Sequence, residues 1–162
     1  MSKPIYAVHF LTEDYTPKHG NEKPWKVGET RTVKGTLSLC KKGYHYCHDW
    51  KAALLGDFLY GPIACIVKVE PSGDEDDHKG VSHTRTLVGA WNVEREMRLF
   101  AADEAERCLK AWEKRSGKVA DIRSWAAVKA ARAFANNQIS ADELSAAESA
   151  AESAAESAAR SA

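Results

Sequence analysis

The sequence predicts an α+β protein, in which a body with a small mixed or antiparallel sheet and short helices is followed by a helical C-terminal tail. One observation is a change of composition near residue 100. Nine of the ten glycines and all five prolines precede it, whereas Ala, Glu, Ser, Lys and Arg dominate the remainder of the chain. The other is "PIACIVKVE", residues 62–70, the most strand-like run in the chain. We therefore expect an α+β body over 1–100, a helical hairpin over 101–139 packed on or beside it, and a tail over 140–162.

The elements of the body are predicted from local signals. Runs rich in β-branched and aromatic residues, bounded by glycine and proline, predict strands. These strands are expected at 4–10, in short pieces within 26–40, at 44–47, at 62–70 and in a last β segment over 85–100. Asp49 is expected to cap a short helix over 50–55, and the acidic stretch 71–80 is expected to be a solvated loop.

The strand over 63–69 is predicted to be central in the sheet. Both of its faces begin apolar, and only one turns polar, at Lys68 and Glu70. A strand that is apolar on both faces is typically covered on both sides. We expect burial on both faces where this strand begins.

Two helices are predicted between residues 101 and 139. Ala105, Cys108, Leu109 and Trp112 recur at spacings of three and four, which gives the first helix one apolar stripe. A glycine at 117 is expected to end that helix, and an aspartate at 121 is expected to cap the next, which ends at the asparagine pair 136–137.

The tail begins with a capping box, in which Ser140 and Glu143 each satisfy a backbone N–H. A Ser-Ala-Ala-Glu repeat comes next, and its glutamates form like-charged pairs four residues apart. A four-residue period turns about 40° per repeat around a 3.6-residue helix, so no fixed apolar face is expected. The tail is predicted to be a solvated helix that contributes little to the stability of the body. The alternative is a helix-packing segment that forms a homo-oligomer.

Composition excludes some classes of protein. Lys plus Arg and Asp plus Glu are 23 each, so the net charge is zero and gives no general attraction to nucleic acid or anionic membranes. No run approaches the roughly 20 apolar residues of a membrane span, and the N-terminus has no signal-peptide pattern. Four cysteines in a chain of this length are not typical of a disulfide-stapled module. We expect a soluble cytoplasmic protein.

The stretch "LCKKGYHYCHDW", residues 39–50, holds two cysteines and two histidines. Gly43 is expected to set a turn into a strand with Tyr44 and Tyr46 on one face and His45 and Cys47 on the other. The spacing does not match the paired knuckles of structural zinc sites, so no metal is predicted, and a zinc-stabilised binding module is one alternative. A nucleophilic role for Cys47, beside a histidine and a helix N-terminus, is another.

Several motifs resemble a family of small domains of bacteriophages and bacteria. They are "VGET", the "C-x-x-G-Y-H-x-C" core of "LCKKGYHYC", the strand "IACIVKVE", the acidic loop and the closing "VEREM". The resemblance covers about residues 5–100. It implies a phage or prophage accessory protein that binds a host or phage protein and lies in the host cytoplasm.

"GYHYCHDWKAALLGDFLYG" followed by "PIACIVKVE" is also similar to the middle section of ADP-ribosyltransferases. The resemblance implies an NAD site in which His9, His45 and Glu96 are catalytic, with Glu94 as the alternative carboxylate on the last strand. Tyr44, Tyr46 and Tyr60 would then bind the cofactor by stacking, while the carboxylate holds the ribose as positive charge develops on the sugar.

Three hypotheses about function remain open at this point. The first is a phage or prophage protein-interaction module without catalysis. The second is an ADP-ribosyltransferase-like enzyme or a nucleotide binder that has lost catalysis, and the third is the zinc-stabilised module. Shared fold does not establish shared function, so the geometry of a site must separate them.

Overall fold

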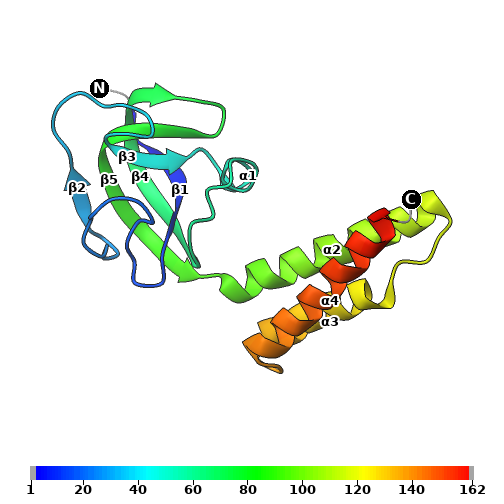
Figure 1. Ribbon diagram of the computed structural model, residues 1–162. Coiled ribbons are helices and arrows are strands. Elements are labelled where there is room, and N and C mark those ends of the chain that lie inside the picture. Colours follow the sequence, from blue (N-terminus) through cyan, green and yellow to red (C-terminus); the bar gives the residue numbers. More distant parts are fainter. Residues whose placement is uncertain (1–2, 161–162) are drawn as a thin grey trace. The chain divides into compact units, whose positions relative to one another are not determined.

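The computed structural model describes residues 3–160, in which five strands and four helices are found (Figure 1). The chain divides into two compact units, residues 1–93, here called the sheet unit, and residues 94–162, the helical unit. The predicted α+β fold with a helical C-terminal part is confirmed. The first and last two residues, which belong to the predicted body and tail, lie outside the described residues.

The sheet unit is built from one antiparallel sheet. Its strands are β1 (Ile5–Leu11), β2 (Thr30–Thr32), β3 (Tyr44–Cys47), β4 (Ile63–Glu75) and β5 (Lys79–Asn92). They lie in the order β2-β5-β3-β1-β4, and β5 also pairs with β4. Because β5 pairs with both β3 and β4, the sheet closes on itself, and β2 is attached as an edge strand (Figure 1).

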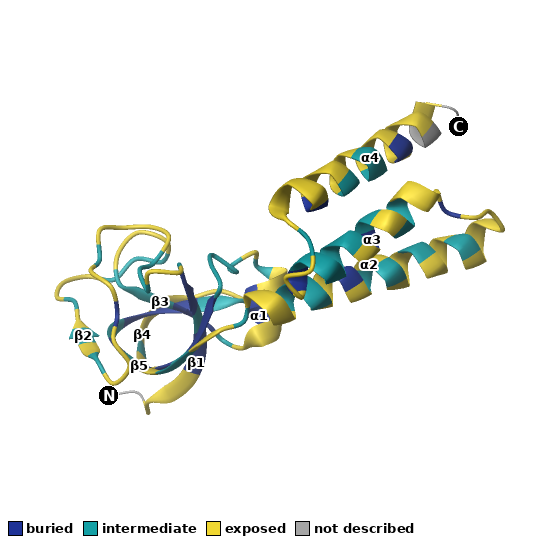
Figure 2. Cartoon of the chain, turned by 90° about the horizontal axis from the view of Figure 1, so that it is seen from below, coloured by how far each residue is buried: buried dark blue, intermediate teal, exposed yellow. Residues whose placement is uncertain are grey.

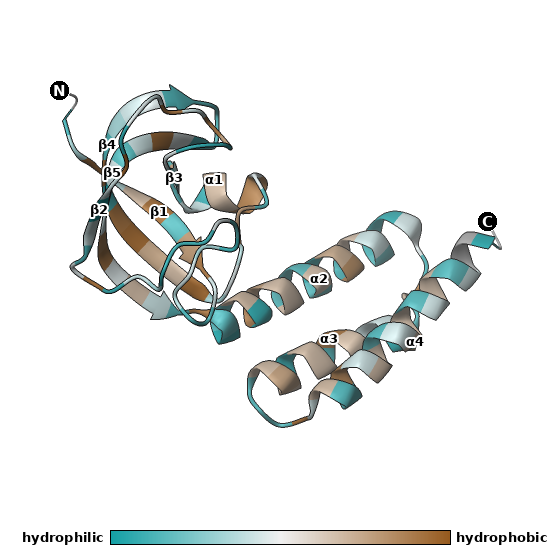
Figure 3. Cartoon of the chain, turned by 60° about the vertical axis from the view of Figure 1, so that its left-hand side comes forward, coloured by the Kyte–Doolittle hydropathy of each residue, from teal (hydrophilic) through white to brown (hydrophobic). Residues whose placement is uncertain are grey.

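The closed sheet has an inner and an outer core, because side chains alternate between its faces. The inner core consists of Ala7, Leu11, Trp25, Tyr46, Ile63, Cys65, Val67, Val69 and Leu87. The outer core lies against the short helix α1 (Trp50–Leu55) and consists of Val8, Phe10, Cys47, Ala52, Ala53 and Ala64. Figure 2 marks buried positions of β1 and β3 in dark blue, and Figure 3 shows hydrophobic stretches along the strands.

The prediction of a central strand over 63–69 is confirmed. It belongs to β4, which lies between β1 and β5, and Ile63, Ala64 and Cys65 are all buried. The strand is longer than predicted, since residues 71–75 of the expected acidic loop continue it and pair with β5. The loop prediction is wrong there because a two-stranded extension leaves the acidic side chains exposed while the backbone remains paired.

The prediction of β structure over 85–100 is wrong after Asn92. Here β5 ends, and α2 (Glu94–Ser116) begins at Glu94. Glu94 and Glu96 lie in the first helical turn, where carboxylates interact favourably with the helix dipole. Arg98 forms an ion pair with Glu94, one turn earlier in the helix. These local helix signals determine the structure after the last strand pairing.

The helical unit contains α2, α3 (Ile122–Ala135) and α4 (Ala141–Arg160). Gly117 follows α2 with a φ of +67°, and the Asp121 side chain accepts a hydrogen bond from the backbone of Arg123, as the sequence predicts. The capping box is also confirmed, because Ser140 and Glu143 exchange hydrogen bonds between side chain and backbone. Within residues 3–160, no helix is both long enough and apolar enough to cross a membrane.

The expectation that α4 has no fixed apolar face is wrong. The helix packs against α3, and Leu144 and Ala154 are buried, with Ala147 and Ala151 half-buried between them. These positions are three and four residues apart, which keeps them on one side of a helix. Each repeat offers two adjacent alanines, so the contact moves from one to the other and compensates for the turn of the repeat.

Candidate functional site

A cavity of about 580 Å³ opens in the sheet unit and is the candidate site, here called the His9 cavity. Strands β1, β3 and β5 supply part of its wall, and the segments 17–22, 40–43 and 58–60 supply the rest. Its size lies within the range of small-molecule sites. The lining residues are His9, Phe10, Pro17, Lys18, His19, Gly20, Glu22, Cys40, Lys41, Gly43, His45, Tyr46, Cys47, Phe58, Tyr60, Lys79 and Arg85.

His9 lies on β1 between the inner-core residues Ala7 and Leu11. The residue is partly exposed, but its Nε2 atom is buried and has no hydrogen-bond partner among the described residues. Burial, and after it the charges of Arg85 and His45, keep the pKa of His9 well below its usual value. A buried ring nitrogen without a partner is costly in a folded protein, so the atom is poised to bond a ligand or water.

Arg85 is a buried cation in the wall of the same cavity, with 2% of its surface exposed. Its Nη1 donates to the carbonyl oxygen of His45 at 3.0 Å, and its Nη2 lies 3.8 Å from Glu22 Oε2. Burial lowers the pKa of Arg85 to about 10, so the guanidinium is charged at neutral pH. A guanidinium has five N–H donors, and these contacts leave part of that capacity available.

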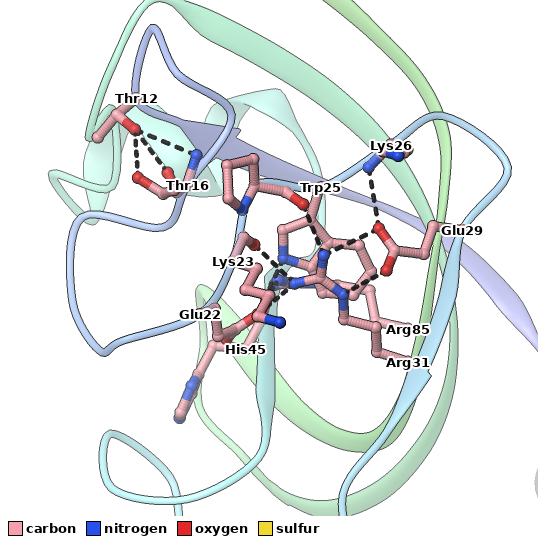
Figure 4. A network of polar contacts seen from close by, with 11 residues as sticks. Thr12, Thr16, Glu22, Lys23, Trp25, Lys26, Glu29, Arg31, His45 and Arg85 are labelled. Atoms are coloured by element: carbon pink, nitrogen blue, oxygen red, sulfur yellow. Dashed lines mark hydrogen bonds and ion pairs between the residues drawn. The ribbon is translucent and has the colours of Figure 1, made fainter.

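The indole of Trp25 holds Arg85 in place (Figure 4). The guanidinium carbon of Arg85 lies 4.5 Å from the indole centroid, and that of Arg31 lies 4.1 Å from it. Trp25 Nε1 donates to Glu22 at 2.9 Å, and Glu29 binds Arg31 at 2.7 Å. Two carboxylates therefore balance two guanidinium groups, and Glu22 is already engaged by several donors.

Lysines add further positive charge to the cavity. Lys18, Lys41 and Lys79 all line it, and none forms an ion pair with a carboxylate in the part of the chain that the structure describes. With Arg85 they make four cationic side chains against Glu22, the one acidic lining residue. This excess of positive charge attracts anions.

Aromatic rings form another part of the wall. Tyr60 packs edge-on against Phe58 and against His19, with ring centroids 5.9 and 5.3 Å apart. The ammonium group of Lys79 lies 4.3 Å from the Phe58 centroid, and that of Lys18 lies 5.3 Å from the Tyr60 centroid. The wall thus offers flat apolar surface next to positive charge.

The comparisons with known proteins add no family at this point. No family model, curated protein or solved structure matches the chain. The site must therefore be judged on its own geometry and chemistry.

The structure brings together most of the site residues predicted from the sequence. His9, His45, Tyr46 and Tyr60 all line the His9 cavity. Tyr44 is not a lining residue, because its ring packs edge-on against Trp25, 5.5 Å away, and contacts the inner core.

The predicted carboxylate belongs to the other unit of the chain. Glu96 and its alternative Glu94 were expected on the last strand, but both lie in the first turn of α2, in the helical unit.

The cysteines and histidines of residues 39–50 have different surroundings and do not form one common site. Gly43 has a φ of +121° and sets the predicted turn, and the two tyrosines contact the inner core while Cys47 is buried in the outer core. His45 Nε2 accepts a hydrogen bond from the backbone N–H of Cys40 at 2.7 Å. Among residues 3–160, no group of three or more potential ligands is arranged to hold a metal ion.

The geometry does not favour Cys47 as a nucleophile. Its side chain is buried, and burial raises the pKa of its thiol to about 11. The reactive form of cysteine is the thiolate, which is scarce at neutral pH when the pKa is this high.

Sequence reasoning missed Arg85, Glu22, Trp25 and Lys79. One signal for Arg85 was present, since it alternates with threonines and shares its strand face with Leu87. A charge at an inward position of a strand indicates either a buried ion pair or a site.

Proposed function

We propose that the sheet unit is a binding module for a small molecule, which occupies the His9 cavity. The observation that carries this proposal is the buried Nε2 of His9, which lacks a partner beside the buried cation Arg85. Proteins rarely leave such groups unsatisfied, and a ligand that accepts or donates hydrogen bonds there would compensate for the cost. On the motifs that resemble small phage and bacterial domains, we propose this binding as part of a phage or prophage accessory role.

Binding is favoured over catalysis because Glu22, the one carboxylate that lines the cavity, already has partners within the protein. Glu22 accepts a hydrogen bond from Trp25 and lies within ion-pair distance of Arg31 and Arg85. A general base or an oxocarbenium-stabilising carboxylate must face the substrate, whereas Glu22 is engaged by the indole N–H and the two guanidinium groups. NAD therefore enters the proposal as a ligand to be tested, not as a substrate.

A fragment screen by NMR on the ¹⁵N-labelled full chain tests the proposal. The library contains neutral, cationic and anionic fragments, together with NAD. We expect at least one class to shift the backbone amides of His9, His45 and Arg85, because these residues line one cavity. Tyr60→Ala should weaken that binding, and Tyr6→Ala, which changes a tyrosine that is 68% exposed and does not line the cavity, should not.

Three outcomes would contradict the proposal. One is a screen in which no fragment class binds the sheet unit. Another is binding that shifts amides elsewhere and leaves His9, His45 and Arg85 unchanged. A Tyr6→Ala variant that loses as much affinity as Tyr60→Ala would likewise argue for adventitious contacts.

A second candidate function, self-association, is supported by an apolar groove in the helical unit. The groove, here called the alanine groove, has a volume of about 810 Å³. Its lining residues are Ala101, Ala102, Ala105, Cys108, Leu109, Trp112, Arg115, Ala120, Asp121, Ser124, Ala127, Val128, Ala131, Glu148, Ala151, Ala154 and Ala155. They include the predicted stripe of α2, which is therefore confirmed as one face.

We infer that a second copy of the chain covers the alanine groove. Helix α4 carries five acidic residues and one basic residue, whereas residues 107–118 carry five basic residues and one acidic residue. Glu148 and Arg115 both line the groove. In a symmetric pair, the acidic helix of one copy would lie against the basic segment of the other, which gives charge complementarity around an apolar centre.

Removing residues 146–162 tests this association. We expect the full chain to be a dimer by light scattering after size exclusion, and the shortened chain to be a monomer. The melting midpoint of the sheet unit should change by only a few degrees, because α4 makes its main contacts with α3. A full chain that stays monomeric at high concentration contradicts the association, and a large fall in that midpoint contradicts the peripheral role of the tail.

A further inference from the structure

We infer, as a deeper statement of the proposed function, that the ligand of the His9 cavity is an organic phosphate monoester whose phosphate lies between Arg85 and His9. The inference rests on three observations about the cavity. They are its charge, the directions from which its donors come, and the aromatic surface beside them.

The charge of the cavity selects an anion. Lys18, Lys41, Lys79 and Arg85 line it, and the one acidic lining residue, Glu22, already receives the Trp25 N–H and lies near two guanidinium groups. With a neutral ligand, the buried guanidinium of Arg85 would keep, as polar contacts with the described residues, only its hydrogen bond to the His45 carbonyl oxygen and its ion pair with Glu22 at 3.8 Å. An anion in contact with Arg85 would form charge-assisted hydrogen bonds with a guanidinium that is itself buried.

The placement of the donors favours a phosphate over a carboxylate. The four cations come from separate places: Lys18 from the loop after β1, Lys41 from the loop before β3, Lys79 from the start of β5 and Arg85 from its middle. A carboxylate has two oxygens in one plane, which a single guanidinium can satisfy. A phosphate monoester has three terminal oxygens and a charge near −2 at neutral pH, so it can accept from donors on several sides.

His9 supplies a directional donor within this arrangement. Its Nε2 is buried without a partner in the described chain, and the residue lines the cavity together with Arg85 and His45. A neutral imidazole protonated on Nε2 donates one hydrogen bond, which a phosphate oxygen accepts. The same bond satisfies the atom that is otherwise unpaired.

The aromatic wall indicates that the ester carries an organic group. Phe58, Tyr60 and His19 line the cavity together, and lysine ammonium groups lie over two of their rings. A cavity of about 580 Å³ is much larger than inorganic phosphate. Inorganic phosphate has no apolar group that could contact these rings. A ring on the ester would pack against this wall while its phosphate remains near Arg85.

Melting curves with four matched probes test the inference. The probes are phenyl phosphate, inorganic phosphate, benzoate and phenol, at equal ionic strength and neutral pH. We expect phenyl phosphate to raise the melting midpoint of the full chain most, since a ligand that binds only the folded state stabilises it. Inorganic phosphate should act more weakly, and benzoate and phenol should have little effect.

Variants at matched lysines make the test specific. Lys79→Gln should weaken phenyl phosphate binding by about tenfold, as expected for loss of a charge-assisted contact. Lys68→Gln should not, because Lys68 is exposed on β4 and does not line the cavity. His9→Gln should weaken binding as well, and amide shifts at His9 and Arg85 should identify the site.

The outcomes separate the ligand class from the proposed function. Equal stabilisation by benzoate, or by phenol, overturns the phosphate assignment. Equal loss in Lys68→Gln and Lys79→Gln overturns the site. If neutral fragments bind at His9 and no phosphate does, the ligand class fails while the binding module stands; if nothing binds there, both fail.

Discussion

Replacing Trp25 by alanine should lower the free energy of unfolding of the sheet unit by about 3–5 kcal/mol, the range for removing a buried aromatic side chain. The indole is 3% exposed and belongs to the inner core. Its removal leaves a cavity and takes away the surface against which Arg31 and Arg85 stack. Urea denaturation followed by circular dichroism measures the change.

Two further variants separate the contributions at this position. Trp25→Phe keeps most of the apolar contact and removes the N–H that Glu22 accepts, so a loss of about 1–2 kcal/mol is expected. Trp91→Ala is the matched control, because Trp91 is 55% exposed and its truncation should cost less than about 1 kcal/mol. A Trp25→Ala loss no greater than that of Trp91→Ala would show that the indole does not organise the core.

The sequence predicted most of the sheet because the signals for its strands are local. The β-branched and aromatic runs at 4–10 and 62–70, the turn at Gly43 and the cap at Asp49 each depend on a few neighbouring residues. The same holds for the helix boundaries at Gly117 and Asp121. Its errors occur where a local pattern is ambiguous, as after Asn92, where "VEREMRLF" suits a strand edge and a helix start alike.

The site was predicted only in part, because closure of the sheet is not a local property. His9 and Arg85 are distant in the sequence, and they line one cavity because β5 pairs with β3 on one side and with β4 on the other. Glu22 forms an ion pair with Arg85 from an irregular loop, and the sequence pattern does not predict the conformation of such a loop. The prediction that Glu94 or Glu96 lies in the cleft assumes that the last strand extends through them. That strand ends at Asn92, and both residues lie in α2.

Acid is expected to destabilise the sheet unit through His9. Burial keeps the pKa of folded His9 well below the value of 6.5 that it has when exposed, and the charges of Arg85 and His45 act in the same direction. Between those two pKa values the unfolded chain binds a proton that the folded chain does not. The free energy of unfolding should therefore fall as pH drops below about 6.5, by up to about 1.4 kcal/mol per pH unit from this one group.

His9→Gln should reduce this pH dependence, since glutamine does not titrate. Urea denaturation at a series of pH values between neutrality and the onset of carboxylate protonation measures the slope. His45 contributes in the same direction, because burial and the charges of Lys79 and Arg85 lower its pKa too, so some slope should remain. Val88→Gln, which places the same side chain at an exposed position of β5 outside the cavity, is the matched control and should keep the slope of the parent chain. The opposing result is a parent chain whose stability stays constant between neutral pH and the pH at which carboxylates begin to be protonated. That result would show that His9 is as well solvated in the folded state as in the unfolded chain. Its Nε2 could then not serve as the buried donor on which the proposed site depends.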